Sequence, residues 1–151
     1  MKRWFLLIGF LVLTVGGGLT IGSITQPGEW YAHLAKPSFN PPSRVFAPVW
    51  TSLYIFIAVG GWRAWQLDRG GRRMWLWWGQ LGLNFLWSPL FFGAHLIGLA
   101  FVTLLLLLVM IVSFIIASIQ KDRVAILLFA PYAAWVVFAS VLNASIWLLN
   151  R

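Results

Sequence analysis

The sequence predicts an all-α, polytopic membrane protein whose single domain, residues 1–151, is a bundle of five transmembrane helices. Hydrophobic residues make up 61% of the chain and charged residues only 9%, whereas an average soluble domain is about a quarter charged. So little charge cannot keep so much apolar side chain in water, so lipid is expected to surround much of the surface. Near-continuous apolar runs without strict alternation favour helices over a β-barrel.

Five apolar stretches are each close to the length of about 20 residues that an α-helix needs to cross the hydrocarbon layer. They are residues 4–24, 48–65, 74–93, 96–119 and 124–149. The first follows Lys2 and Arg3 as a signal peptide would, but it lacks a small-residue cleavage site and continues to Ile24, which favours a retained helix. Pro89 and Pro131 lie inside two later stretches, and each predicts a kink that opens space between helices.

The net charge is +8, and the basic residues fall in the gaps between the apolar stretches. This pattern is typical of membrane topology signals and of contact with anionic lipid, so the expected partner is the bilayer and not nucleic acid. If the helices alternate in direction, the N-terminal side holds Lys2, Arg3, Arg63, Arg69, Arg72, Arg73, Lys121 and Arg123, and the other side holds Lys36, Arg44 and Arg151. The excess of basic residues on the N-terminal side predicts a cytoplasmic N-terminus in a bacterial cell membrane, although an outer-membrane location stays open.

The ionisable residues exclude several kinds of chemistry. The chain has no cysteine, and its only acids, Glu29, Asp68 and Asp122, lie in the gaps, which argues against a proton- or ion-coupled transporter. His33 and His95 have no carboxylate partner in the pattern, so we interpret them as ordinary interfacial residues and expect no metal site. The sequence also offers no hydrolytic triad and no nucleotide loop, so neither a conventional catalytic site nor a cofactor is expected.

Polar side chains inside the apolar stretches are the candidates for function. Asn84 and Trp135 lie deep in their stretches, whereas Trp50 and Asn143 lie nearer the outer ends. An amide or an indole N–H needs a hydrogen-bond partner in hydrocarbon, and it finds one either across a helix interface or in a ligand cavity. Residue type alone leaves both interpretations open.

The longest gap, residues 25–47, combines prolines with aromatic side chains. Proline fixes φ and removes a backbone donor, so we expect a stiff loop that is partly non-helical. Its prolines are Pro27, Pro37, Pro41 and Pro42, and its aromatic residues are Trp30, Tyr31, Phe39 and Phe46. Such a loop either covers the helix ends as a lid or packs on the lipid headgroups.

Three sequence blocks resemble the translocator protein family, which is also called the tryptophan-rich sensory protein or peripheral benzodiazepine receptor family. The blocks are WYAHLAKPSFNPP at 30–42 with VFAPVWTSLY at 45–54, LNFLWSPLFFG at 83–93, and PYAAWVVFASVLN at 131–143. The order of these blocks and the spacing between them agree with the pattern of the family over the whole chain. The resemblance implies five transmembrane helices, a homodimer, and a hydrophobic ligand pocket inside each bundle that the first loop closes.

The resemblance also implies particular ligands and residues. Ligands of the family include porphyrins such as protoporphyrin IX, sterols, and synthetic benzodiazepine-type or isoquinoline compounds. The pocket positions correspond to Tyr31, Trp50, Asn84, Trp135, Ala139 and Asn143, and the lid residues to Trp30, Lys36, Pro41, Pro42 and Phe46. The C-terminal region 141–151 lacks the Tyr that the family's cholesterol motif requires, which argues against cholesterol binding.

Three functional hypotheses follow from the resemblance. The first is a membrane receptor that binds porphyrins and other hydrophobic ligands, with a regulatory or transport role in tetrapyrrole metabolism. The second is a light-dependent porphyrin-degrading enzyme in which Trp50 and Trp135 exchange electrons with the excited macrocycle. The third is a passive transporter of tetrapyrroles or sterols.

Overall fold

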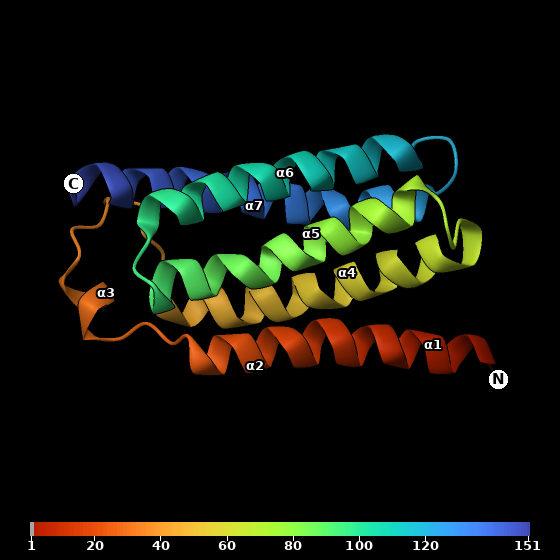
Figure 1. Ribbon diagram of the computed structural model, residues 1–151, viewed down its shortest axis with the longest axis horizontal. Helices are drawn as coiled ribbons and strands as arrows, with labels where there is room; N and C mark the ends of the chain where they lie inside the picture. The colour runs from red at the N-terminus through yellow and green to blue at the C-terminus, as the bar shows by residue number, and fades with distance from the viewer. Residues whose placement is uncertain (1) are drawn as a thin grey trace.

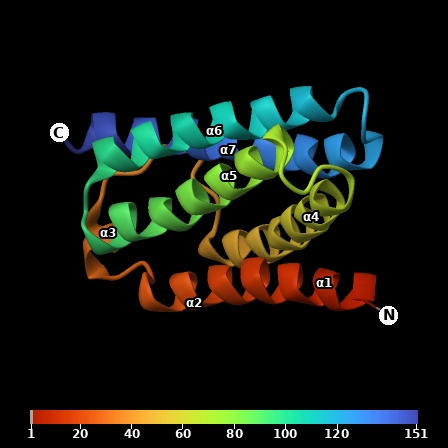
Figure 2. The same ribbon diagram turned by 45° about the vertical axis from the view of Figure 1, so that its right-hand side comes forward.

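The computed structural model describes residues 2–151 and consists of helices that run side by side along the length of the molecule (Figures 1 and 2). The first helical segment is α1 (Lys2–Leu11), a π-helical turn (Val12–Gly16) and α2 (Gly17–Ile24); the short α3 (Glu29–His33) follows. A 3₁₀ turn (Ser43–Val45) leads into α4 (Phe46–Leu67), and α5 (Arg72–Ser88) ends in a second π-helical turn (Pro89–Gly93). Helices α6 (Ile97–Ser118) and α7 (Arg123–Leu149) complete the described chain, which confirms the predicted all-α fold.

The number of membrane-spanning helices differs from the prediction of five. Four described helical segments are long and apolar enough to cross a membrane: Arg3–Ile24, Ser43–Leu67, Ile97–Ser118 and Arg123–Leu149. Helix α5 does not meet this standard, because its 17 residues include Arg73, Gln80 and Asn84, which lower its hydropathy. All three of these polar side chains are buried within the bundle. Helix α5 lies among the spanning helices (Figure 1), and its polar side chains are buried between them.

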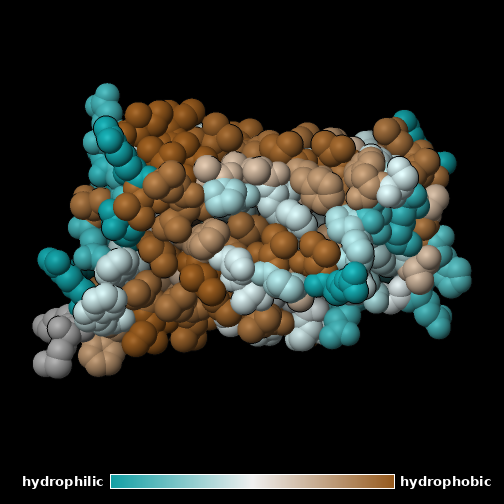
Figure 3. All heavy atoms as spheres, turned by 180° about the vertical axis from the view of Figure 1, so that it is seen from behind, coloured by the Kyte–Doolittle hydropathy of each residue, from teal (hydrophilic) through white to brown (hydrophobic). Residues whose placement is uncertain are grey.

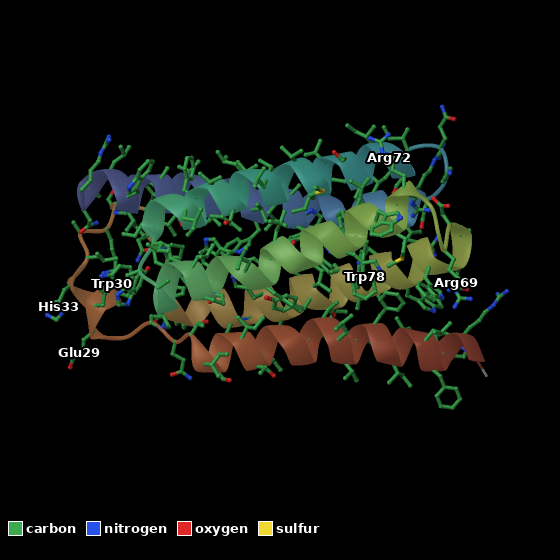
Figure 4. All side chains as sticks on the ribbon, viewed as in Figure 1. Glu29, Trp30, His33, Arg69, Arg72 and Trp78 are labelled. Atoms are coloured by element: carbon green, nitrogen blue, oxygen red, sulfur yellow. The ribbon has the colours of Figure 1, made fainter. Side chains whose placement is uncertain are left out.

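The surface is divided into an apolar middle and two polar ends. Figure 3 shows hydrophobic residues over the long central part and hydrophilic residues at both ends of the molecule. Exposed apolar side chains such as Leu105, Val109, Ile116 and Leu127 contribute to this central belt. The pattern is that of an integral membrane protein whose helices are surrounded by lipid. Figure 4 shows Arg69 and Arg72 near one end, and Glu29, Trp30 and His33 at the other.

The prolines of the helices have different local effects. Pro48 stands in the first turn of α4, where a missing backbone N–H is not needed for helix hydrogen bonding. Pro89 begins the π-helical turn that ends α5, so the regular helix changes its geometry at the expected place. Helix α7 continues as an α-helix through Pro131 up to Leu149.

Two adjacent glycines allow α4 to approach two neighbouring helices. A Cβ atom at Gly60 would overlap the ring of Phe129 in α7, and a Cβ atom at Gly61 would overlap the indole of Trp77 in α5. The indole N–H of Trp77 donates a 2.9 Å hydrogen bond to the carbonyl oxygen of Ile57, one turn before Gly61. The absence of side chains at this dipeptide therefore lets a fully buried tryptophan reach the α4 backbone.

The Gly61→Val variant is expected to destabilise the fold strongly. Its side chain would displace Trp77, so the variant would combine overpacking, which costs typically 1–3 kcal/mol, with the loss of a buried hydrogen bond, which costs about 1–3 kcal/mol. Thermal unfolding in detergent, followed by circular dichroism, measures the effect. Gly9→Val is the matched control, because a Cβ atom at Gly9 meets no atom within 4 Å. Equal melting temperatures for the two variants would contradict the close-packing role of Gly61.

A buried ionic cluster joins α4, α5 and α7 at the end of the molecule that holds the N-terminus. The carboxylate of Asp122 accepts hydrogen bonds from Arg63 Nε at 3.0 Å and from Arg73 Nη2 at 3.2 Å. The same carboxylate accepts a bond from the backbone N–H of Ala125 at 3.1 Å, so it also caps the start of α7. Arg73 Nε donates to Ser118 Oγ at 3.1 Å, which adds α6 to the cluster.

The electrostatic environment keeps Asp122 charged. Burial on its own would raise the pKa of this carboxyl group, but the hydrogen bonds from Arg63 and Ala125, the positive charge of Arg63 and the bond from Arg73 together lower it below its ordinary value. The side chains of Asp122 and Arg73 are 0% and 1% exposed. The sequence placed Asp122 in a loop between apolar stretches, but it did not predict that the carboxylate would be buried.

Candidate functional site

A cavity of about 470 Å³ lies near the end of the bundle that is opposite the ionic cluster. Helices α2, α4, α5 and α7 and the loop between α2 and α4 supply its walls. All six of the predicted pocket residues lie in the lining: Tyr31, Trp50, Asn84, Trp135, Ala139 and Asn143. Residues from four separate parts of the sequence are therefore brought to one cavity, and its volume falls in the range of roughly 300–1,000 Å³ that is typical of small-molecule sites.

One wall of the cavity is a row of aromatic rings. The rings of Trp50 in α4 and Trp87 in α5 are stacked, with centroids 6.3 Å apart and an interplanar angle of 27°. Trp87 is stacked in turn on Phe91, at 5.8 Å and 29°. Sequence reasoning did not select Trp87 or Phe91. The available signal was their spacing from Asn84, because residues three and seven positions further along a helix lie on the same face.

The amide groups of the cavity are hydrogen-bonded across helix interfaces. Asn84 Oδ1 accepts a bond from the Tyr54 hydroxyl at 3.0 Å, and Asn84 Nδ2 donates to the Tyr132 hydroxyl at 2.7 Å. Tyr132 donates onward to Gln80 Oε1 at 2.8 Å, which extends the chain of polar groups into the core. Asn84 thus fits both of the interpretations left open above, since it joins helices and also lines the cavity.

Asn143 on α7 has a similar double role. Its Nδ2 donates to the carbonyl oxygen of Ile97 at 2.9 Å, and its Oδ1 accepts a bond from the Trp87 indole at 3.3 Å. The bond to Ile97 ties α7 to the start of α6, and the bond to Trp87 fixes the aromatic row. The amides therefore hold the cavity walls in place while contributing polar atoms to an otherwise apolar lining.

Trp135 and Ala139 form the α7 side of the cavity. The Trp135 ring makes an edge contact with Phe46, at 6.0 Å between centroids, and a tilted contact with Phe138 at 5.3 Å. Among the described residues, the Trp135 Nε1 atom is buried and has no hydrogen-bond acceptor. Ala139 follows one turn later and is 9% exposed, so its small side chain leaves room in the cavity.

The loop between α2 and α4 covers the end of the bundle opposite the ionic cluster (Figure 1), and its residues contribute unequally to the cavity. Tyr31 and Phe46 are lining residues, whereas Trp30, Lys36, Pro41 and Pro42 are not. Trp30 is stacked on His95 at 3.9 Å and 12°, at the connection between the second π-helical turn and α6. That connection is tight, since His95 has a positive φ of 58°. Trp30 therefore holds the loop on the helix ends without lining the cavity.

Hydrogen bonds fix the loop in two further places. The backbone of Ala35 exchanges two 2.9 Å bonds with the side chain of Asn150 at the end of α7. The Lys36 ammonium donates to the carbonyl oxygens of Ala32 and Leu34 and lies over the ring of Tyr31, 4.6 Å from its centroid. Burial raises the pKa of Tyr31, and its hydrogen bond with Asn40 opposes this shift. The loop is thus attached both to the connection that precedes α6 and to the end of α7.

The histidines take part in packing and capping. His33 Nδ1 is 2.7 Å from the carbonyl oxygen of Glu29 in the short α3 helix, and the ring of His95 is stacked on the ring of Trp30. Within residues 2–151, no group of three or more His, Cys, Asp or Glu side chains is placed to hold a metal ion. The residues that line the cavity offer aromatic stacking, apolar contact and hydrogen bonding.

Comparison with known proteins identifies the family. The sequence model of the TspO/MBR family matches residues 10–148, which include every cavity residue described above. The chain belongs to the TspO/MBR family. This assignment confirms the resemblance that the three sequence blocks indicate.

Relatives of this TspO/MBR chain occur in bacteria, archaea and animals. The tryptophan-rich sensory protein of Cereibacter sphaeroides is 35% identical over 97% of this chain and 92% of its own length. The human translocator protein is 38% identical over 98% of this chain and 92% of its own length. The tryptophan-rich protein TspO of Archaeoglobus fulgidus is 39% identical over 92% of each chain.

Proposed function

We propose that this TspO/MBR protein is a membrane receptor for porphyrins and other flat hydrophobic ligands, with a regulatory or transport role in tetrapyrrole metabolism. The observation that carries the proposal is the 470 Å³ cavity, in which Trp50, Trp87 and Trp135 supply aromatic surface on two sides. Aromatic rings attract other rings by stacking and edge contacts worth about 0.5–1.5 kcal/mol each, beyond the area that they bury. A macrocycle such as protoporphyrin IX presents a large ring system for such contacts.

The polar groups of the cavity suggest how a porphyrin would be oriented. Gln26 and Ser43 line the cavity and are exposed, so they mark its outer mouth. The carboxylates of a porphyrin would stay at this mouth, because burying a charge without a partner is costly. The apolar ring would extend toward Trp50 and Trp135.

Tryptophan fluorescence provides a direct test of binding. Protoporphyrin IX titrated into the purified protein in detergent should quench the fluorescence with a saturable curve at micromolar concentrations, because three tryptophans line the cavity. The Trp50→Ala variant should retain the fold and require roughly tenfold more porphyrin, since one stacking contact is lost. Quenching that rises linearly without saturation in the wild type would contradict the proposed function.

Several further expectations belong to the same proposal. We place the protein in a bacterial cell membrane with a cytoplasmic N-terminus, which would put the cavity and its loop on the outer side. The relatives are named for sensing and for translocation, so a regulatory and a transport role each have support. Flux of protoporphyrin into proteoliposomes above the level of empty vesicles distinguishes transport from regulation alone. The homodimer stays a prediction.

The stiffness of the loop predicts slow release of ligand. If the loop closes the cavity, the Pro41→Gly/Pro42→Gly double variant should release protoporphyrin faster, because glycine gives the loop more conformations to occupy when open. Two such exchanges, at roughly 0.4–1 kcal/mol each, correspond to a dissociation rate about four- to thirtyfold higher. Stopped-flow fluorescence measures that rate directly.

The Lys36→Ala variant tests whether the loop acts by holding α3 in place or by supplying groups to the cavity. The Lys36 ammonium bonds to carbonyl oxygens at the end of α3, so its loss should loosen α3 without removing a group from the cavity lining. A modest rise in dissociation rate, smaller than in the double-glycine variant, is expected. Equal rates in the wild type and both variants would rule out the lid while leaving the cavity as a binding site.

A further inference from the structure

The cavity wall formed by α2 is only one helix thick. Leu19, Gly22 and Ser23 line the cavity and are also exposed on the outside of the bundle. Across from them, Ala47 in the first turn of α4 is likewise a lining residue that is exposed. Figures 1 and 2 both show α1 and α2 along the outer margin of the bundle. The thin part of the wall therefore lies between the end of α2 and the start of α4, next to the apolar belt.

The packing of the first helical segment changes along its length. A Cβ atom at Gly18 would overlap the ring of Tyr54, and a Cβ atom at Gly17 would lie 2.7 Å from Phe85, so this part of the segment is closely packed on α4 and α5. One turn later, a Cβ atom at Gly22 would meet no atom within 4 Å. The segment also contains the π-helical turn Val12–Gly16 just before the close contact. The end of α2 is thus loosely packed beyond a firmly held point.

A single pair of hydroxyl groups holds the end of α2 to α5. Thr25 Oγ1 and Ser88 Oγ are 2.6 Å apart. The Thr25 hydroxyl donates to the carbonyl oxygen of Ile21, so the proton between the two hydroxyls comes from Ser88. Both residues line the cavity. Among the side-chain hydrogen bonds of the described residues, this is the one that ties the last turn of α2 to another helix.

We propose that the end of α2 and the start of α4 form a lateral portal through which ligands exchange directly with the bilayer, and that the Thr25–Ser88 pair is its latch. When the latch opens, the end of α2 moves outward about the Gly17–Gly18 contact, and the gap beside Ala47 widens. A neutral hydroxyl pair is suited to this task, because its hydrogen bond contributes only about 0.5–1.5 kcal/mol and is easily broken. The inference rests on the proposed binding function and adds the route of access.

The source of the ligand follows from the position of the portal. Its exposed residues are apolar or small, and the neighbouring surface of α2 includes Leu19, which is 59% exposed. A hydrophobic ring system dissolved in the bilayer would reach this gap without entering water. In the wild type the loop above the cavity, which Trp30 and Asn150 hold in place, would then stay closed during exchange. The faster release expected of the double-glycine variant would reflect a second route, which opens only when the loop is loosened.

Disulfide locking tests the portal, because the chain contains no cysteine that would form competing bonds. The Thr25→Cys/Ser88→Cys variant replaces two hydroxyl oxygens that are 2.6 Å apart by sulfurs whose bond length is about 2.05 Å. Association and dissociation of protoporphyrin IX are measured by stopped-flow fluorescence in proteoliposomes, before and after reduction. Oxidation should slow both rates at least tenfold while the ratio of the rates, and hence the Kd, changes little.

A second disulfide examines the competing route through the loop. The Ala35→Cys/Asn150→Cys variant locks the loop to the end of α7, where the two residues are already hydrogen-bonded. It should leave the exchange rates within about twofold of the reduced form. Slow exchange in this variant, together with normal exchange in the locked α2 variant, would overturn the portal and assign access to the loop.

A bulky side chain provides a test that needs no cross-link. Gly22→Phe adds a ring at the portal, where its Cβ has open space, and should slow association and dissociation together. Gly9→Phe, which also has open space around its Cβ but lies on α1 outside the cavity lining, should exchange ligand like the wild type. Equal rates for the two variants would overturn the portal even if neither disulfide forms. Absence of saturable binding in the wild type would instead contradict the proposed function.

Discussion

Replacing Ala139 with Phe is expected to weaken porphyrin binding by up to roughly a hundredfold while leaving the protein folded. Ala139 lies on α7 between Trp135 and Asn143, and its methyl group faces the cavity lining. A phenyl ring at this position would occupy volume that a ligand needs, and an overlap of about 1–3 kcal/mol corresponds to as much as a hundredfold loss of affinity. Fluorescence titration with protoporphyrin IX measures the affinity, and circular dichroism verifies that the helix content is unchanged.

The control for this variant lies on the same helix. Ala134 is exposed and lines a shallow lipid-facing groove together with residues of α4, outside the main cavity. Ala134→Phe therefore adds the same ring to α7 without filling the cavity, and its affinity should stay within about twofold of the wild type. A similar loss of affinity in both variants would show that any added ring on α7 weakens binding, whether or not it fills the cavity. The cavity would then not be the place where the porphyrin binds.

The Asp122→Asn variant is expected to cause the largest loss of stability. It leaves the side chain in place but removes the charge that compensates Arg63 and the buried Arg73. Removing one partner of a buried ion pair costs about 3–5 kcal/mol, because the remaining charge has no counter-ion in a medium that solvates it poorly. Thermal unfolding in detergent should therefore show a clear drop in Tm. Glu29→Gln, which removes an exposed negative charge in α3, should change the Tm very little.

The pH dependence of stability should carry the signature of the same carboxylate. The pKa of Asp122 is lower in the folded protein than the ordinary value of about 4, so its protonation disfavours the native state. The stabilisation is fully present above the unfolded pKa, and it is lost as the pH falls through about 4 toward the folded pKa. In the Asp122→Asn variant this acid-side loss should be reduced. An unchanged acid profile in the variant would assign the loss to other groups.

The helices and much of the candidate site follow from local and family-level signals in the sequence. Apolar length predicts a spanning helix because the thickness of the bilayer fixes how many residues are needed. The α4, α6 and α7 helices accordingly begin and end within about two residues of the predicted stretches. Helix α5 was counted as a fifth span because its tryptophans resemble apolar residues in the pattern, whereas its buried polar face lowers its hydropathy.

Features that depend on distant contacts escaped prediction. Arg63 and Arg73 bind Asp122 across 59 and 49 positions of the chain. The presence of a charged residue between two apolar stretches does not reveal which distant residue will pair with it. The stacking of Trp30 on His95 is equally remote in sequence, so the loop's anchor was not foreseen. Trp87 lies within one of the family blocks, but its position there does not mark it as a site residue, because its role depends on facing Trp50 from another helix.

The two ends of the bundle are held together by interactions of very different strength, and this difference sets where the native state opens first. At one end, α4, α5, α6 and α7 meet in the buried Arg63–Asp122–Arg73–Ser118 cluster. At the other, one hydroxyl pair is the side-chain hydrogen bond that attaches the last turn of α2, beside a partly empty interior. Backbone amides near the cavity should accordingly exchange their hydrogens by small local openings, while those near the cluster exchange only when the whole bundle unfolds. A bound ligand would then slow hydrogen exchange selectively at the α2 end. The exchange rate of these amides would therefore report whether the cavity is occupied.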